Sequence, residues 1–430
     1  APAVHLADCA ANASEIIAMA KAMSETAHPD LIVFPEMCVT GYSCGDLFHN
    51  DTLLAGALDA LAEIADATRA LPCTLLVGMP LRIAGTLYNC AVALSGGKPL
   101  GIVPKTYVPN YNEFYEKRWW AGAPANTVAT TLLGHCVPFG TQQLFACGDA
   151  LVGVEICEDL WTPAPPSGFA AMAGAHVIAN LSASDDLIGK YSYLRTLIAQ
   201  QSARCCCAYV YASAGYGESS TDLVFDGKTI IAENGRTLAA NQRWSHESQW
   251  VVADIDLCAI NRDRMHTGSF TDCARRNDTG TYTISAAVDV EPHSIPLAYR
   301  AIDPRPFVPA DDENLNAHCD EIINIQVAGL CRRLDATRCR NLVVGISGGL
   351  DSTLALLVAV AAFDKLGLPR TGITGVTMPG FGTTSRTHDN AVTLMKRLGV
   401  ATREISIVPA VMQHFSDIGH DAAIKDVTYE

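Results

Sequence analysis

Hydrophobic and polar positions along the chain follow two patterns, which predict buried strands and helices with one buried face. Short apolar runs bounded by turn residues predict strands, at residues 31–34, 74–78, 87–94, 100–103, 151–157, 176–180, 208–212 and 249–255. Apolar residues at helical spacing predict helices, at residues 12–27, about 51–69 and 191–207. Asn12 and Ser14 are both suited to capping the first of these helices. The alternation of strands and helices predicts a layered α/β domain over residues 1–260.

Turn residues and prolines divide the chain further. The dipeptides Asp226-Gly227 and Asn234-Gly235 predict tight hairpin turns. From about residue 257 the regular pattern fades, and Pro292, Pro296 and Pro309 belong to a proline-rich stretch. We therefore expect a linker or arm over residues 261–312.

The pattern restarts with a helix from about residue 313 to 334 and continues as alternating strands and helices. Further strands are predicted near residues 342–346, 371–378 and 402–407, with helices after the first two. Such β-α-β units imply a doubly wound parallel sheet that binds ligands at the carboxyl ends of its strands. This sheet would form a second α/β domain over residues 313–430.

Composition narrows the class of protein. A length of 430 residues favours two or three domains, since one domain usually has about 100–200 residues. No apolar stretch approaches the roughly 18–20 residues of a membrane span, and a formal net charge of -15 argues against nucleic acid as a partner. The 16 cysteines are scattered, and no secretion signal precedes them, so we expect a reducing, cytoplasmic compartment. The run Cys205-Cys206-Cys207 lacks metal-ligand spacing and is interpreted as structural thiols.

A glycine-rich loop connects the strand at 342–346 to the following helix. Its sequence is Ser347-Gly348-Gly349-Leu350-Asp351-Ser352. Backbone N–H groups and the positive end of a helix suit phosphate, and the Asp351 carboxylate suits Mg²⁺. The loop lacks the Gly-x-x-x-x-Gly-Lys pattern of kinase-type P-loops. We interpret it as a pyrophosphate-binding loop; the alternative is an ordinary strand-to-helix turn.

Glu36, Lys105 and Cys157 each stand at the end of an apolar run in the first domain. Together they supply the groups that amide hydrolysis requires: a thiol nucleophile, a carboxylate base and a cation for the oxyanion. Taken singly, Cys157 fits a buried structural thiol and Lys105 fits a surface charge. Their common placement at strand ends favours a catalytic set.

The residues around these three resemble the nitrilase superfamily, the carbon–nitrogen hydrolases with a Glu-Lys-Cys triad. The matching stretches are Phe34-Pro35-Glu36-Met37, Pro104-Lys105-Thr106-Tyr107 and Ile156-Cys157-Glu158-Asp159-Leu160-Trp161. The resemblance spans most of residues 3–260 and implies an α-β-β-α sandwich that acts on glutamine or another carboxamide. It also implies that Glu113 is a second glutamate that orders the site.

The same resemblance implies a glutamine pocket, lined by Tyr42, Tyr111, Glu158, Trp161, Ser184 and Lys190. Lys190 stands where members of the glutamine-using subgroup have arginine. Lysine lacks the planar fork of arginine, so its contact with a substrate carboxylate would differ. For Tyr111 and Trp161, aromatic packing is the alternative interpretation.

The glycine-rich loop resembles the ATP pyrophosphatases, which adenylate an oxygen of their acceptor. With the loop at Met378-Pro379-Gly380-Phe381-Gly382-Thr383-Thr384-Ser385 and the stretch Lys425-Asp426-Val427-Thr428-Tyr429-Glu430, the chain closely resembles the glutamine-dependent NAD synthetases. That resemblance implies ATP as co-substrate, Mg²⁺ on Asp351, and Thr383 and Ser385 near the nucleotide; a flexible turn is the alternative for that second loop. It also implies a homo-oligomer that amidates deamido-NAD with ammonia released from glutamine.

Chains of that family continue well beyond the stretch at Glu430, and this one starts at Ala1 without an initiator methionine. We therefore expect the sequence to be trimmed at both ends and its second domain to be incomplete. Two other functions stay open: a glutamine-dependent ligase with another acceptor, and a carbon–nitrogen hydrolase whose second domain only senses a nucleotide.

Overall fold

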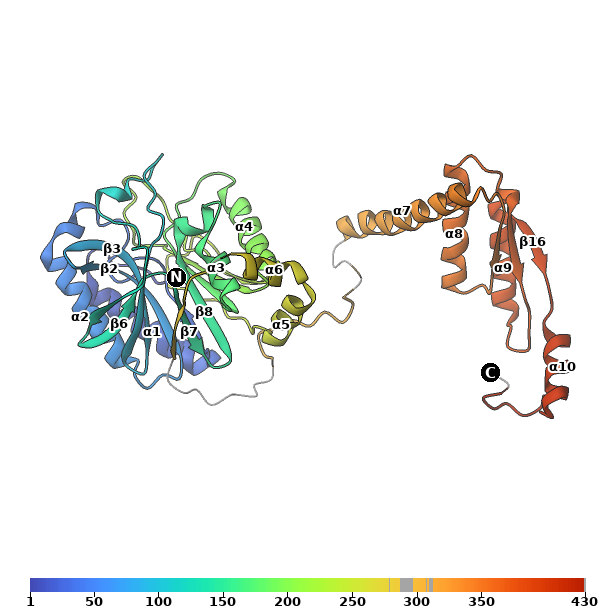
Figure 1. The fold of residues 1–430 in the computed structure, drawn as a ribbon, viewed down its shortest axis with the longest axis horizontal. Helices are drawn as coiled ribbons and strands as arrows, with labels where there is room; N and C mark the ends of the chain where they lie inside the picture. The colour runs from blue at the N-terminus through green and yellow to red at the C-terminus, as the bar shows by residue number, and fades with distance from the viewer. Residues whose placement is uncertain (278, 287–296, 307, 309–311, 429–430) are drawn as a thin grey trace. The chain divides into compact units, whose positions relative to one another are not determined.

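The computed structural model describes residues 1–277, 279–286, 297–306, 308 and 312–428. Its compact units are Ala1–Ala301 and Ile302–Glu430 (Figure 1). Three of the prolines that predicted an arm (Pro292, Pro296 and Pro309) lie outside the described residues, as does the dipeptide Tyr429-Glu430.

The first sheet of unit Ala1–Ala301 has the strand order β1-β2-β3-β4-β6-β5. Its strands are β1 (Leu31–Val33), β2 (Thr74–Ile83), β3 (Thr86–Ser95), β4 (Lys98–Pro104), β5 (Val128–Leu132) and β6 (His135–Phe139). Strands β2, β3 and β4, each of which covers a predicted strand, form an antiparallel meander. The turn between β2 and β3 is tight because Ala84 and Gly85 both adopt positive φ, 51° and 82°.

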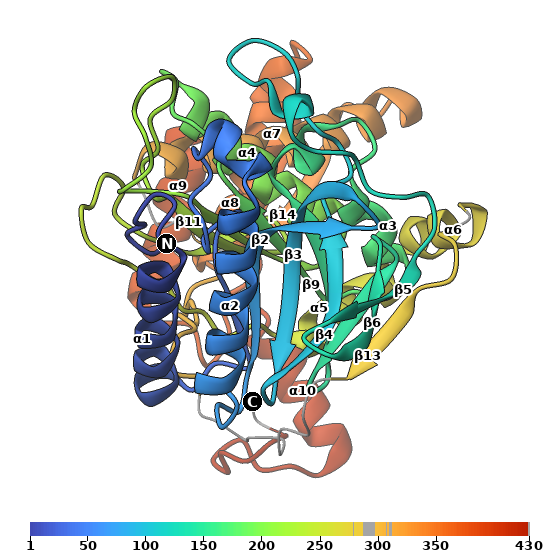
Figure 2. The same ribbon diagram turned by 90° about the vertical axis from the view of Figure 1, so that its left-hand side faces the viewer.

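Helices α1 (Cys9–Ala27) and α2 (Asp51–Ala67) lie side by side on the outer face of this sheet (Figure 2). The helix α1 begins earlier than predicted, because the Asp8 side chain accepts the Ala11 N–H at 3.0 Å and caps it. Asn12 is not the cap. Its buried amide donates instead to the carbonyl oxygens of His5, at 2.9 Å, and Val39, at 3.1 Å.

The second sheet has the strand order β12-β11-β10-β9-β8-β7-β13. Its strands are β7 (Gln143–Cys147), β8 (Ala150–Ile156), β9 (Val177–Ser182), β10 (Ala208–Ser213), β11 (Thr229–Glu233), β12 (Arg236–Ala240) and β13 (Thr283–Ala286). Its central strands β8, β9 and β10 are parallel. Helices α3 (Pro166–Met172) and α4 (Lys190–Arg204) pack against these strands.

Alternate residues of the strands face different layers. Leu76 of β2 and Val154 of β8 belong to an apolar cluster between the sheets. Val77 of β2 instead packs with α1 and α2, and Ile178 of β9 packs with α3 and α4. Because side chains alternate along a strand, each sheet buries both faces. The result confirms the predicted α-β-β-α sandwich.

Two predicted local features differ in the structure. The Asn234-Gly235 turn joins the antiparallel strands β11 and β12 as predicted, but Asp226-Gly227 makes no two-residue hairpin. It lies in the long connection from β10 to β11, whose ends are residues 213 and 229. Residues 249–255 were predicted as a strand and belong to neither sheet.

The stretch 261–312, expected as a linker, contains regular structure within its described part. Helices α5 (Leu257–His266) and α6 (Gly268–Arg276) lie there, and β13 pairs in parallel with β7. Of the ten residues of α5, Ile260 is the buried one, so this helix shows little of the apolar periodicity that predicts a helix.

Unit Ile302–Glu430 contains a parallel sheet of order β14-β15-β16. Its elements are α7 (Asp312–Thr337), β14 (Leu342–Gly345), α8 (Leu350–Lys365), β15 (Ile373–Thr377), α9 (Ser385–Leu398), β16 (Ala401–Glu404) and α10 (Val408–Ile418). Leu334 of α7, Phe363 of α8, Ile373 of β15 and Met395 of α9 share its core. This alternation confirms the predicted parallel α/β class.

Short 3-10 helices connect several elements, at Gly45–His49, Glu116–Arg118, Cys157–Trp161 and Arg370–Gly372. Within the described ranges, every helix is too short or too polar to cross a lipid bilayer. All 16 cysteines are free thiols.

Candidate active site

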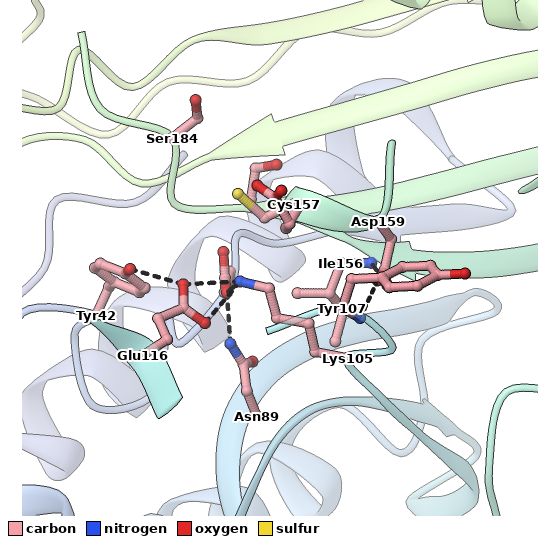
Figure 3. A network of polar contacts seen from close by, with 12 residues as sticks. Tyr42, Asn89, Lys105, Tyr107, Glu116, Ile156, Cys157, Asp159 and Ser184 are labelled. Atoms are coloured by element: carbon pink, nitrogen blue, oxygen red, sulfur yellow. Dashed lines mark hydrogen bonds and ion pairs between the residues drawn. The ribbon is translucent and has the colours of Figure 1, made fainter. Parts of the chain in front are cut away.

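Glu36, Lys105 and Cys157 come together at one end of the sandwich. Lys105 and Cys157 directly follow β4 and β8, and Glu36 lies in the turn that follows β1. All are buried, with exposed fractions of 1% for Glu36, 0% for Lys105 and 6% for Cys157. The sheets thus bring three residues that are far apart in sequence into one buried site, in which Figure 3 shows Lys105 and Cys157.

Lys105 lies between two carboxylates. Its Nζ is 2.9 Å from Oε1 of Glu36 and 2.9 Å from each carboxylate oxygen of Glu116. Burial by itself lowers the pKa of Lys105, but the negative charges of Glu116 and Glu36 outweigh burial and hold this pKa well above its usual value. Lys105 therefore stays a cation whose position is fixed by both glutamates.

Glu36 has one engaged and one open carboxylate oxygen. Oε1 accepts from Lys105 and from Nδ2 of Asn89, at 2.5 Å. Oε2 is buried without a hydrogen-bond partner among the described residues. A buried acceptor without a partner is costly, so it is a ready acceptor for a proton from the reacting group.

Cys157 begins the short helix Cys157–Trp161 in a left-handed conformation, with φ of 43°. Its N–H donates to Oδ1 of Asn180 at 3.1 Å. Burial, followed by the negative charge of Glu36, raises the pKa of the Cys157 thiol to about 12, although Lys105 opposes this. Cys157 is therefore a neutral thiol near neutral pH, and a base would have to take its proton before the sulfur could act as a nucleophile.

The second glutamate at Lys105 is Glu116, and the prediction of Glu113 is corrected. Glu116 begins the 3-10 helix Glu116–Arg118, which turns its buried side chain toward Lys105. Glu113 is half-exposed in the preceding loop, after Asn112 in a left-handed conformation. The N–H of buried Trp120 donates to the Glu116 carbonyl oxygen at 3.0 Å, a contact of the folded loop that the sequence pattern does not show.

The Glu116 carboxylate is linked to Tyr42, whose hydroxyl donates to Oε1 at 2.8 Å. Burial, and then the charge of Glu36, raise the pKa of Glu116 to about 7 against the opposing charge of Lys105. Tyr42 was predicted to line a glutamine pocket. In the structure its hydroxyl orients the carboxylate that holds Lys105.

The other pocket candidates gather around the Cys157–Trp161 helix. The Tyr111 hydroxyl donates to Oε1 of Glu158 at 2.6 Å. Trp161 stacks on Tyr193, with ring centroids 5.6 Å apart. Ser184 is buried, and its N–H donates to Ser213 Oγ at 3.1 Å.

Lys190 joins this aromatic group from the first turn of α4. Its Nζ lies 5.6 Å from the ring centroid of Phe114 and 5.7 Å from that of Trp161. It also pairs with the Asp185 carboxylate. A compact ammonium thus lies among aromatic rings, with one of its donors already engaged.

In unit Ile302–Glu430, the loop Ser347–Ser352 leads from β14 into α8. Gly348 adopts φ of 82°, and a Cβ at this position would lie 2.1 Å from the Thr387 carbonyl oxygen. Ser347 Oγ lies 3.2 Å from Ser352 Oγ, and Asp351 is exposed on the first turn of α8. Only glycine permits so close an approach to the start of α9.

The predicted second loop, which contains Thr383 and Ser385, runs into that same start of α9. Thr383 Oγ1 accepts the Gly380 N–H at 2.9 Å, and the neighbouring Thr384 caps α9. Thr383 and Ser385 are exposed. The two predicted nucleotide loops are therefore adjacent within this unit.

Two family models match this chain. The family model described as carbon-nitrogen hydrolase matches residues 3–265. The chain belongs to the carbon–nitrogen hydrolase family. A second family model, described as NAD synthase, matches residues 322–429 of the same chain.

A curated relative from Mycobacterium bovis, named glutamine-dependent NAD(+) synthetase, is 42% identical over 99% of this chain. The chain spans 63% of the length of that relative. A solved glutamine-dependent NAD(+) synthetase from Cytophaga hutchinsonii shares the fold, with a TM-score of 0.54, 23% identity and coverage of 97% of this chain and 66% of that one. The one from Acinetobacter baumannii, in complex with ADP, has a TM-score of 0.50, 21% identity, and coverage of 97% and 65%.

Sequence reasoning missed two polar residues of this carbon–nitrogen hydrolase site, Asn89 and Asp159. Asn89 bonds Glu36, as described above. Asp159 is buried, and it accepts the Tyr107 N–H at 2.8 Å and the Ile156 N–H at 3.0 Å. It thereby joins the backbone after Lys105 to the backbone before Cys157. Its place two residues after Cys157 was quoted in the motif, but its partners depend on the fold.

Proposed function

We propose that this chain hydrolyses glutamine at Cys157 and that the ammonia serves an ATP-dependent amidation of deamido-NAD to NAD. The observation that carries the proposal is the buried Lys105, held between Glu36 and Glu116 beside the neutral thiol of Cys157. The acceptor is inferred from the relatives named glutamine-dependent NAD(+) synthetase. Glutamate, AMP and pyrophosphate are the other expected products.

In the first step Glu36 Oε2 removes the proton from the Cys157 thiol as sulfur attacks the carboxamide carbon. The open oxygen of Glu36 and the raised pKa of the thiol support this order of events. Lys105 stabilises the negative charge that develops on the amide oxygen. The proton on Glu36 then passes to the leaving nitrogen, so ammonia departs and a thioester remains.

Water completes the cycle. Glu36, again ionised, removes a proton from water, and the hydroxide attacks the thioester and releases glutamate and the thiol. Glu116 keeps Lys105 aimed at the oxyanion throughout, and Tyr42 keeps Glu116 in place. Every proton that Glu36 accepts is returned to a leaving group.

Glutamine recognition is proposed for the residues near Cys157–Trp161. The carboxylate of Glu158 would attract the α-ammonium group, and Lys190 would attract the α-carboxylate. Because Lys190 already pairs with Asp185, its attraction is weaker than that of an unpaired cation. Tyr111, Trp161 and Ser184 would enclose the side chain.

The nucleotide site is proposed for residues 347–352, together with Thr383 and Ser385. The close approach at Gly348 and the backbone N–H groups at the start of α8 support phosphate binding. The ADP bound by the Acinetobacter baumannii protein supports an adenine nucleotide as ligand of this fold. Adenylation would convert an oxygen of the acceptor carboxylate into a leaving group for attack by ammonia.

Mg²⁺ would bind through Asp351. The described residues contain no group of three or more His, Cys, Asp or Glu suited to a metal ion. A single exposed carboxylate fits Mg²⁺, which usually keeps several waters and uses substrate phosphates as ligands. When bound, the ion would neutralise phosphate charge.

Pyrophosphate release by the full-length protein tests the acceptor. We expect release with ATP and deamido-NAD and none with other carboxylates. Release with a different acceptor would favour another ligase, and ATP binding without pyrophosphate would favour a nucleotide sensor. A cytoplasmic homo-oligomer is expected by analogy with the relatives.

A further inference from the structure

Three buried polar side chains lie on neighbouring strands behind the nucleophile. They are Glu155 of β8, Asn180 of β9 and Tyr209 of β10, with exposed fractions of 1%, 0% and 0%. Strand alternation turns them toward the layer of α3 and α4, since their neighbours Val154 and Ala179 face the other sheet. Buried polar groups are costly unless each is hydrogen-bonded.

Hydrogen bonds join these groups into one chain. Glu155 Oε2 accepts the Ser167 N–H at 2.8 Å, and Oε1 accepts the Tyr209 hydroxyl. The Tyr209 oxygen in turn accepts from Nδ2 of Asn180 at 2.9 Å. The Tyr209 hydroxyl donates its proton to Glu155, so its oxygen can only accept from Asn180. The NH₂ group of Asn180 must therefore point toward Tyr209, and its Oδ1 points toward β8.

Asn180 Oδ1 is hydrogen-bonded to the backbone of Cys157. Asn180 Oδ1 accepts the Cys157 N–H at 3.1 Å and the Ser182 hydroxyl at 2.8 Å. The Ser182 carbonyl accepts the Glu36 N–H at 3.3 Å. One strand therefore contacts the backbone of both the proposed nucleophile and the proposed base.

We propose that Asn180, oriented by Tyr209 and Glu155, is a positioning residue that holds Cys157 in its attacking conformation. The left-handed φ of Cys157 is strained for a residue with a Cβ, so it needs support from its surroundings. Without the Asn180 acceptor, the buried N–H loses its partner and the backbone relaxes, which moves the sulfur. The inference rests on the proposed hydrolysis of glutamine.

The test compares Tyr209→Phe and Asn180→Ala with the wild-type chain. Glutamine hydrolysis is measured as kcat and KM, together with the melting temperature and the rate of Cys157 alkylation by iodoacetamide. Tyr282→Phe is the matched control, because Tyr282 packs against the same apolar layer and its hydroxyl is outside this hydrogen-bonded chain.

For Tyr209→Phe we expect kcat to fall about 10-fold, and for Asn180→Ala about 100-fold, with KM within about twofold of wild type. Alkylation of Cys157 should slow in parallel, and the control should match wild type. A lower melting temperature with kcat and alkylation unchanged would overturn the inference, because the residues would then be structural only. If Asn180→Ala fails to fold, Tyr209→Phe decides alone.

The alkylation rate separates this inference from the proposed function. A wild-type chain that does not hydrolyse glutamine would contradict the proposed function, and the alkylation rates would still decide the role of Asn180. Equal alkylation of wild type and Tyr209→Phe would overturn the positioning role in that case. Slower alkylation of the variant would uphold it.

Discussion

At the residue scale, the site depends on the balance of charge around Lys105. One buried cation faces two glutamates, and a neutral thiol lies beside them. A buried ion pair is strongly destabilised when one partner is removed, because the other charge then stays buried without compensation. Each member of this cluster should therefore affect both stability and rate.

Glu116→Gln tests which glutamate orders Lys105. We expect glutamine hydrolysis to fall about 100-fold or more, because Lys105 loses its bidentate partner. The free energy of unfolding should fall by about 1–3 kcal/mol, because Lys105 keeps its ion pair with Glu36 but loses the charge on its second partner. Glu113→Gln is the matched control and should stay within about twofold in rate. Equal losses in both variants, measured as kcat and by chemical denaturation, would contradict this assignment.

The raised pKa of Cys157 predicts the pH dependence of its alkylation. Thiolate is the reactive form, and below a pKa of about 12 its fraction rises with pH. The rate of alkylation of Cys157 by iodoacetamide should rise about tenfold per pH unit from about pH 7 to 9. Mass spectrometry of the Cys157 peptide measures this rate. A plateau in that range would mean that the thiolate already exists in the free enzyme.

At the element scale, the proposed catalytic residues are positioned by strand ends and by the close approach of β2 to the turn after β1. Gly78 of β2 faces the turn that carries Glu36, and a Cβ there would lie 2.4 Å from the Pro35 carbonyl oxygen and 2.7 Å from the Glu36 Cα. Backbone atoms cannot move aside as a flexible side chain can. Only glycine lets β2 support this turn.

Gly78→Ala should therefore displace Glu36. We expect glutamine hydrolysis to fall about 100-fold and stability to fall by about 1–3 kcal/mol. Gly168→Ala is the control, because a Cβ at Gly168 in α3 meets nothing within 4 Å. Steady-state kinetics with both variants measure the effect. A Gly78→Ala enzyme as active as Gly168→Ala would show that the turn tolerates displacement.

Local pattern was sufficient to predict most elements and to place Glu36, Lys105 and Cys157 just after the apolar strands β1, β4 and β8. Local pattern was insufficient where contacts between residues distant in the sequence decide which side chain faces the site. Glu113 and Glu116 differ only in how the loop after Lys105 folds back. Asp159 and Asn180 were unassigned because their partners, Tyr107 and Cys157, are distant from them in the sequence.

At the scale of the whole molecule, two proposed chemistries belong to one polypeptide. Cys157 lies in unit Ala1–Ala301, and Asp351 lies in unit Ile302–Glu430. The unit that contains Cys157 would release ammonia, and the unit that contains Asp351 would activate a carboxylate for attack by that ammonia. Separate units predict that each chemistry can be removed without loss of the other.

The most direct measurement is NAD formation by the full-length protein from ATP and deamido-NAD, with glutamine or an ammonium salt as nitrogen source. We predict that Cys157→Ala abolishes synthesis from glutamine and keeps synthesis from ammonium. Asp351→Ala should abolish both and keep glutamine hydrolysis. Loss of ammonium-supported synthesis in a folded Cys157→Ala protein would contradict separate sites, and unchanged synthesis from glutamine would contradict Cys157 as the nucleophile.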